Sequence, residues 1–176
     1  MNVFPDHAGI VKSAPLPHPP RAPLRLAWAS EADTAAFAQR LAALPDARRA
    51  QIALEGELGA GKTAFARHLL RALGVRGRIK SPTYTVVEPY QPPQGLPVWH
   101  LDFYRFGDPR EWEDAGLREL FAAEGMKLAE WPDKAAPALP PSDLHLRIDP
   151  LEGEQRAVCI TAATPLGQRL LEQLRA

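Results

Sequence analysis

Apolar residues occur along the chain either in short runs or at the spacing of an amphipathic helix. The short runs predict strands at 24–28, 52–54, 85–88, 98–101, 126–129, 144–148 and 156–161. Helical spacing predicts helices from about 31 to 44, from 64 to 73, from 110 to 121 with a break near Gly116, and from 165 to 175. Together these elements predict a single α/β domain with a central, largely parallel sheet flanked by helices.

The first predicted helix has clear signals at both ends. Ser30 and Asp33 match the S-x-x-[DE] pattern of a capping box, and Pro45 follows the apolar stripe as a helix breaker. Thr34 falls in the first turn, where it is expected to be an ordinary solvated helix residue.

The amino-terminal residues 1–23 are rich in proline, poor in large apolar residues and without periodicity. Such a segment cannot support a packed element, so we expect a disordered tail at 1–23 and one domain at 24–176. The tail lacks the apolar stretch of a signal peptide, and no later window has the length of a membrane span. Cys159 is the only cysteine, which excludes an internal disulfide and fits a reducing compartment. We therefore expect a cytoplasmic protein.

The most informative stretch lies between the second predicted strand and the helix that follows it. Gly56, Gly61, Lys62 and Thr63 match the pattern G-x-x-x-x-G-K-[ST], in which backbone N–H groups surround a chain of phosphates. In this pattern the lysine contacts the β- and γ-phosphates, and the hydroxyl ligates the accompanying magnesium ion. The alternative is a glycine-rich turn without a ligand.

Two later strands end in acids. Asp102 follows the apolar run 98–101, and Glu130 follows the run 126–129. Strands parallel to 52–54 would deliver both carboxylates to the phosphate loop. Paired carboxylates repel, and a magnesium ion resolves that conflict because it binds one or two carboxylates together with phosphate oxygens. The alternative is that one of them, Asp102 in particular, only caps a turn.

The segment from Ser81 to Thr85 places a proline among hydroxylated residues. Two interpretations stay open. The segment is either a switch loop beside the γ-phosphate or a plain turn before strand 85–88, and the residues alone favour the turn.

Five segments occur in the order and spacing of one known family: EGELGAGKT, SPTYT, HLDFYR, EWEDAGLRELF and AEWP. Over about residues 24–148 the chain resembles the TsaE (formerly YjeE) family of small bacterial P-loop ATPases, which are needed for the threonylcarbamoyladenosine modification of tRNA. The resemblance implies a compact P-loop NTPase domain, in agreement with the pattern of strands and helices.

The resemblance also implies roles for individual residues. The loop residues that would hold the ATP phosphates are Gly56, Glu57, Leu58, Gly59, Ala60, Gly61 and Lys62. Thr63 would bind the magnesium ion. Glu130 would serve the metal and hydrolysis, with Asp102 as the second acid near the metal. The helix start near Thr34 would approach the adenine, and segment 81–85 would be the mobile loop.

The partners implied by the resemblance are the TsaB and TsaD proteins. TsaD transfers the threonylcarbamoyl group to adenosine 37 of tRNA, and the ATP cycle would reset that assembly, so this chain would meet tRNA only indirectly. The formal net charge is +0 and the sequence pI is about 7.0. A neutral chain fits this role because it does not bind nucleic acid through bulk charge.

Two alternative functions stay open. P-loop folds also support phosphoryl transfer to a hydroxyl, so the chain could be a small-molecule kinase. The segment after the loop lacks an arginine-rich lid, although Arg76 and Arg78 partly resemble one. ATP could instead be a structural ligand of a binding module without essential turnover.

Overall fold

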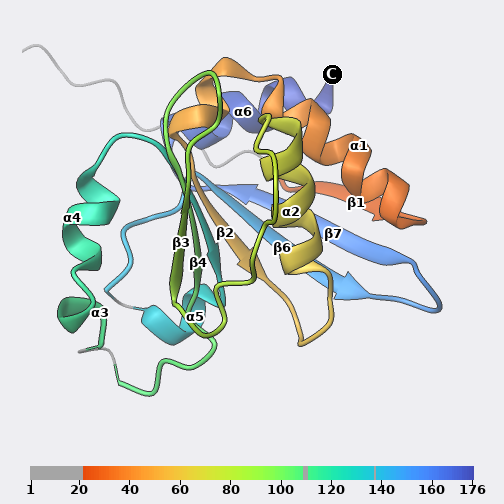
Figure 1. Cartoon of the computed structure of the whole chain (residues 1–176). Helices are drawn as coiled ribbons and strands as arrows, with labels where there is room; N and C mark the ends of the chain where they lie inside the picture. The colour runs from red at the N-terminus through yellow and green to blue at the C-terminus, as the bar shows by residue number, and fades with distance from the viewer. Residues whose placement is uncertain (1–21, 109–110, 137) are drawn as a thin grey trace, which may run out of the picture.

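A computed structural model describes residues 22–108, 111–136 and 138–176. Its described strands form one seven-stranded sheet in the order β1-β7-β6-β2-β5-β4-β3 (Figure 1). The four central strands run parallel: β6 (Leu144–Pro150), β2 (Gln51–Glu55), β5 (Met126–Glu130) and β4 (Val98–Asp102). Antiparallel strands complete the two edges: β1 (Leu24–Trp28), β7 (Arg156–Ala162) and β3 (Val87–Tyr90). The prediction of an α/β fold with a parallel centre is confirmed.

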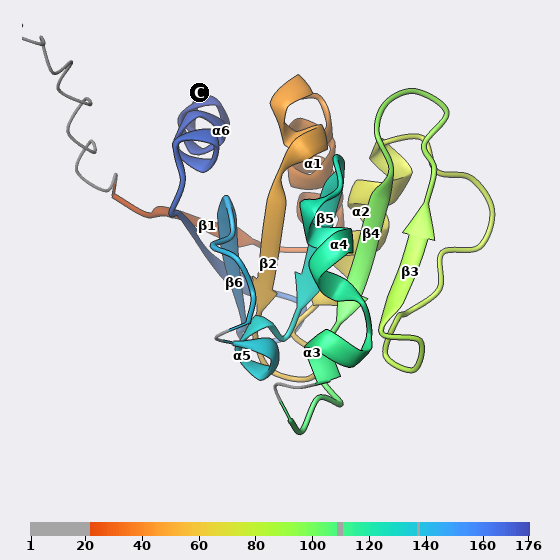
Figure 2. The same ribbon diagram turned by 90° about the vertical axis from the view of Figure 1, so that its left-hand side faces the viewer.

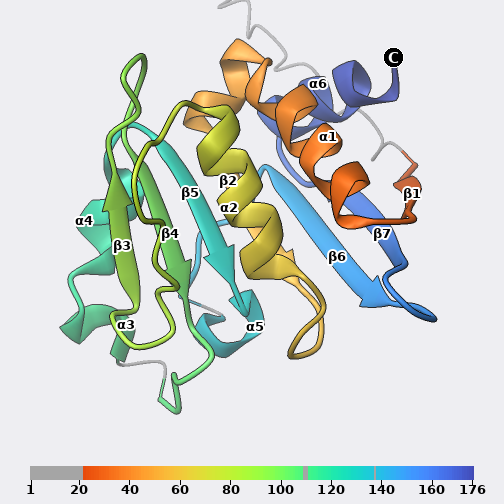
Figure 3. The ribbon, with the colours of Figure 1, turned by 45° about the vertical axis from the view of Figure 1, so that its right-hand side comes forward.

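Helices cover both faces of this sheet. The helices on one face are α1 (Glu31–Ala42) and α2 (Lys62–Ala72), and those on the other are α3 (Glu111–Asp114), α4 (Leu117–Ala122) and α5 (Pro132–Ala135), as Figure 2 shows. A short 3-10 helix, η1 (Pro45–Arg49), follows α1, and α6 (Pro165–Arg175) packs on β6 and β7. Figure 3 shows α2 lying across β2 and β5.

Successive side chains along β4 and β5 point to opposite faces of the sheet, and this alternation determines which residues lie on each face. Val98 and Leu128 belong to the larger hydrophobic cluster, which includes residues of α1 and α2, whereas Leu101 and Ala129 belong to the cluster with α3 and α4. The residues in phase with Val98 and Leu128, including both acids at the strand ends, therefore face α2.

The element ends agree with most sequence signals. The backbone N–H of Ser30 donates to the Asp33 carboxylate at 3.1 Å, as the capping pattern predicts. Gly116 adopts φ +64° between α3 and α4, which confirms the predicted break. The strand predicted at 85–88 lies instead at 87–90. Val86 has φ +65° and its N–H donates to the Pro82 carbonyl at 2.7 Å, so the preceding turn runs through Val86.

The expected disordered tail at 1–23 falls mostly on residues 1–21, which lie outside the described residues. Within the described ranges no helix is long and apolar enough to span a membrane.

Candidate functional site

The glycine-rich loop of residues 56–61 connects the end of β2 to the start of α2. Gly56 has φ +147°, and a Cβ built there would lie 2.3 Å from the carbonyl oxygen of Ile148 on β6. Gly61 has φ +110° and immediately precedes the first residue of α2. Glycine is therefore required at 56 by both backbone angle and space. The first-turn N–H groups of α2, which have no partner within the helix, lie at the end of this loop.

The loop residues differ in exposure. Glu57, Leu58 and Gly59 are exposed, and the Leu58 side chain is 77% accessible. Ala60 is fully buried. The backbone of the exposed part can therefore meet a ligand from solvent, while Ala60 anchors the loop to the core.

Lys62 is buried inside this loop. Its Nζ donates to the carbonyl oxygens of Gly56 at 2.7 Å and Glu57 at 2.8 Å, and it lies 4.0 Å from the centre of the Trp131 ring. Burial lowers the pKa of Lys62, while the carboxylates of Glu130 and Asp102 act in the opposite direction. The loop thus holds a cation within the field of both acids.

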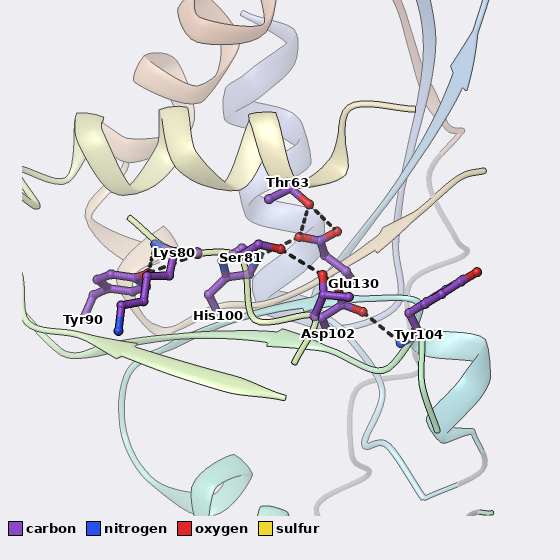
Figure 4. Close-up of polar contacts among 9 residues, drawn as sticks. Thr63, Lys80, Ser81, Tyr90, His100, Asp102, Tyr104 and Glu130 are labelled. Atoms are coloured by element: carbon purple, nitrogen blue, oxygen red, sulfur yellow. Dashed lines mark hydrogen bonds and ion pairs between the residues drawn. The ribbon is translucent and has the colours of Figure 1, made fainter. Parts of the chain in front are cut away.

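The two acids occupy matching positions at the ends of their strands. Asp102 pairs with Glu130 in the β4–β5 register, and their exposed fractions are 4% and 2%. The Thr63 hydroxyl lies 2.9 Å from each oxygen of the Glu130 carboxylate (Figure 4). The predicted approach of Glu130 to the phosphate loop is therefore seen as a direct contact with Thr63.

Asp102 is held by different partners. Its Oδ1 accepts the N–H of Tyr104 at 2.8 Å (Figure 4). Its Oδ2 accepts the Thr83 hydroxyl at 2.8 Å. The first contact is the turn cap that the sequence offered as an alternative for Asp102. The second links Asp102 to segment 81–85. Asp102 thus caps a turn and also lies at the site.

A cleft of about 230 Å³ joins these groups. Its walls are formed by Leu58, Gly59, Gly61, Lys62, Thr63, Ala64, Thr83, Asp102, Tyr104, Glu130 and Trp131. The rings of Tyr104 and Trp131 pack with centroids 5.0 Å apart, and Trp131 has φ +56°. The structure therefore brings together the predicted residues Lys62, Thr63, Asp102 and Glu130.

The donor set in this cleft fits a magnesium ion. Thr63, Asp102 and Glu130 offer only oxygen atoms, which are the ligands that magnesium prefers. Two buried carboxylates beside the ammonium of Lys62 leave a net negative charge, which favours binding of a cation. Among the described residues no cluster of three or more His, Cys, Asp or Glu could hold a metal. The pair of acids instead matches a site completed by phosphate oxygens and waters.

A second cleft of about 170 Å³ lies on the other side of Gly61. It is lined by Trp28, Glu31, Thr34, Ala60, Gly61, Ala64, Glu154 and Arg156. Thr34 is only 7% exposed, so the expectation of an ordinary solvated residue is wrong. Its neighbours in this cleft come from β1, α1, the phosphate loop, α2, the turn between β6 and β7, and β7.

Sequence reasoning missed several residues at these clefts. Arg156 on β7 donates from Nε to the Ala60 carbonyl at 2.9 Å, and Trp28 is its register partner on β1. No local pattern marks either residue, because their place depends on a strand pairing across most of the chain. His100 contacts Glu130, and the H-x-D spacing with Asp102 could have indicated that both share one face of a strand.

A larger cavity, of about 310 Å³, lies on the opposite face of the sheet. Phe121, Lys127, Ala129 and Leu139 are among its lining residues, and none of the four predicted catalytic and metal-binding residues contributes to it. We assign it no role in the site.

The glycine loop between a central parallel strand and a helix, with acids at two further strand ends, defines a P-loop protein. The family model for the threonylcarbamoyl adenosine biosynthesis protein TsaE matches residues 28–158. This chain belongs to the TsaE family.

Relatives and a solved structure agree with this assignment. The tRNA threonylcarbamoyladenosine biosynthesis protein TsaE of Haemophilus influenzae is 38% identical over 135 residues, which cover 77% of this chain and 84% of that protein. The protein of the same name from Bacillus subtilis is 37% identical over 123 residues, covering 70% and 76%. The crystal structure of Bacillus subtilis YdiB superposes with a TM-score of 0.74 at 29% identity and covers 90% of this chain and 97% of that one.

Proposed function

We propose that this protein is an ATPase that binds ATP with magnesium at residues 56–63 and drives the cycle of a TsaB–TsaD assembly that forms threonylcarbamoyladenosine on tRNA. The main observation in support of the proposal is that one cleft at the ends of parallel strands is lined by Lys62, Thr63, Asp102 and Glu130. The names of the relatives support the pathway.

The two clefts suggest how ATP lies. Gly61 and Ala64 line both of them, so one molecule can place its phosphates in the 230 Å³ cleft and its adenosine in the 170 Å³ cleft. Lys62 then contacts the phosphates with its ammonium, and the amino-terminal N–H groups of α2 face the same anion. Thr34 and Arg156 lie on the adenosine side.

The acids would serve the metal and the attacking water. Thr63, Glu130 and Asp102 would hold the magnesium ion, which when bound neutralises charge on the phosphate oxygens. Glu130 is buried and contacts the Thr63 hydroxyl, so an ionised Glu130 carboxylate is placed to accept a hydrogen bond from water beside the terminal phosphate. Asp102, tied to Thr83, couples this site to segment 81–85.

Replacement of Glu130 by alanine tests the proposal. An ATPase cycle predicts that Glu130→Ala still assembles with TsaB and TsaD in the presence of ATP and magnesium but no longer supports tRNA modification in cells. A static, ATP-locked binding module predicts that modification survives. Capture of TsaB and TsaD from the native cytoplasm by the wild-type protein is the matching positive control, and failure of that capture would contradict the proposed partners.

A further inference from the structure

His100 is a fully buried histidine directly behind the candidate site. Its Nε2 lies 2.7 Å from Oε1 of Glu130 (Figure 4). In the β4–β5 register His100 pairs with Leu128, two residues before Glu130, so the imidazole reaches diagonally from one strand to the next. His100 and Asp102 lie two residues apart on the same face of β4.

The hydrogen-bonding pattern indicates which ring nitrogen carries the proton. Nδ1 of His100 is buried and has no hydrogen-bond partner among the described residues. A neutral imidazole has one N–H group. A proton on Nε2 is donated to the carboxylate, whereas a proton on Nδ1 would have no acceptor and would leave a nitrogen lone pair against Glu130. The contact is therefore an Nε2–H donor to a carboxylate oxygen.

We propose that His100 is the positioning residue for Glu130, an inference that rests on the proposed ATPase function. Among the described residues, the other side-chain hydrogen bond to this carboxylate comes from the Thr63 hydroxyl, which has one proton to share between two oxygens at equal distance. The His100 donor distinguishes the two oxygens and stops the carboxylate from rotating, so that Glu130 keeps one orientation toward the cleft. Asp102 has its own partners and does not depend on His100.

The cost of burying this imidazole supports a functional role. A buried nitrogen without a partner destabilises the fold. An apolar side chain at position 100 would avoid that penalty but would not donate to the Glu130 carboxylate. His100 also lies in phase with apolar residues of the larger cluster. A residue that served packing alone at this place would be apolar.

A matched pair of substitutions tests the proposal. His100→Gln keeps an N–H donor at about the reach of Nε2, and His100→Met has similar length and no donor. We expect His100→Met to lower kcat for ATP hydrolysis about 10- to 100-fold, with KM for ATP unchanged, in a variant that thermal unfolding shows to be folded. His100→Gln should restore most of the lost rate. Equal losses in the two variants would overturn the proposal, because they would mean that the ring only fills space.

A spectroscopic readout tests the contact without relying on turnover. Nitrogen-15 NMR of labelled histidine should find His100 as the Nε2–H tautomer, with a signal that shifts in Glu130→Ala. The Nδ1–H tautomer, or a signal indifferent to Glu130→Ala, would overturn the proposal. Absence of ATP hydrolysis by the wild-type protein would instead contradict the proposed function, and the NMR result would still decide whether His100 donates to Glu130.

Discussion

Asp102 and Glu130 are register partners at the last positions of two adjacent parallel strands, and both carboxylates are buried beside Lys62. Their partners differ. Glu130 contacts the Thr63 hydroxyl, while both oxygens of Asp102 already accept from Thr83 and Tyr104. The two acids therefore have unequal shares in any metal site at this edge of the sheet.

Separate amide substitutions should reveal that inequality. We expect Glu130→Gln to reduce ATP hydrolysis at least about 100-fold, the usual size of a lost acid–base group. Asp102→Asn should mainly raise the magnesium concentration needed for half-maximal rate. Initial rates across a magnesium titration measure both effects. If neither substitution alters the rate or its magnesium dependence, the acids do not belong to the metal site.

Gly56→Ala should destabilise the fold through the phosphate loop. The added Cβ would lie 2.3 Å from the Ile148 carbonyl oxygen, at a backbone angle that L-residues rarely adopt. We expect the free energy of unfolding to fall by about 2–4 kcal/mol. Gly153→Ala is the control, because that glycine also has positive φ but its Cβ would meet nothing within 4 Å. If urea unfolding shows the same decrease in the free energy of unfolding for both variants, the close approach of residue 56 to β6 does not contribute to the destabilisation.

Arg156→Met should weaken ATP binding by altering the cleft in which we propose that the adenosine lies. The substitution removes the Nε donor to the Ala60 carbonyl and the guanidinium that lines the smaller cleft. We expect the Kd for ATP to rise about tenfold, which corresponds to one charge-assisted hydrogen bond. Arg169→Met, which changes an exposed arginine on α6, serves as the control. An unchanged Kd in Arg156→Met would exclude Arg156 from the site.

Lys127 gives the fold a pH dependence in the alkaline range. The residue is 2% exposed, and burial lowers its pKa below the ordinary 10.5, while the smaller effect of the Asp143 carboxylate acts in the opposite direction. Between the lowered pKa and 10.5 the unfolded chain binds more protons than the folded chain, so the free energy of unfolding rises with pH. Urea unfolding of wild type and Lys127→Met should show that the free energy of unfolding of the wild type increases relative to that of the variant as pH approaches 10.5.

The comparison with Lys134→Met, an exposed lysine on α5, isolates this effect. A constant stability difference between wild type and Lys127→Met over the same range would show that the Lys127 ammonium is not destabilised by burial.

The sequence predicted those parts of the site that depend on local order. Gly56 to Thr63 follow a strand and open a helix, and Asp102 and Glu130 each end a strand, so parallel pairing alone brings them together. The strand expected at 85–88 was displaced because Val86, a β-branched residue that favours strands, takes a positive φ in the turn.

Other parts depend on long-range pairing. Arg156 reaches the phosphate loop only because β7 lies between β1 and β6, an arrangement that no local pattern specifies. Thr34 is buried because α1 packs beside the same loop. The prediction that Thr34 is a solvated helix residue was therefore wrong. His100 in an apolar strand is indistinguishable from a core residue until its strand is set beside β5.

Binding of ATP at the phosphate loop is tested most directly by calorimetric titration of ATP with magnesium into the wild-type protein and into Lys62→Ala. Thermal unfolding verifies that the variant is folded. Lys62 is the buried cation between the loop carbonyls and the two acids, so its removal takes away the main positive charge offered to the phosphates. We expect saturable binding to the wild type and loss of that binding in folded Lys62→Ala. Unchanged affinity in the folded variant would contradict it.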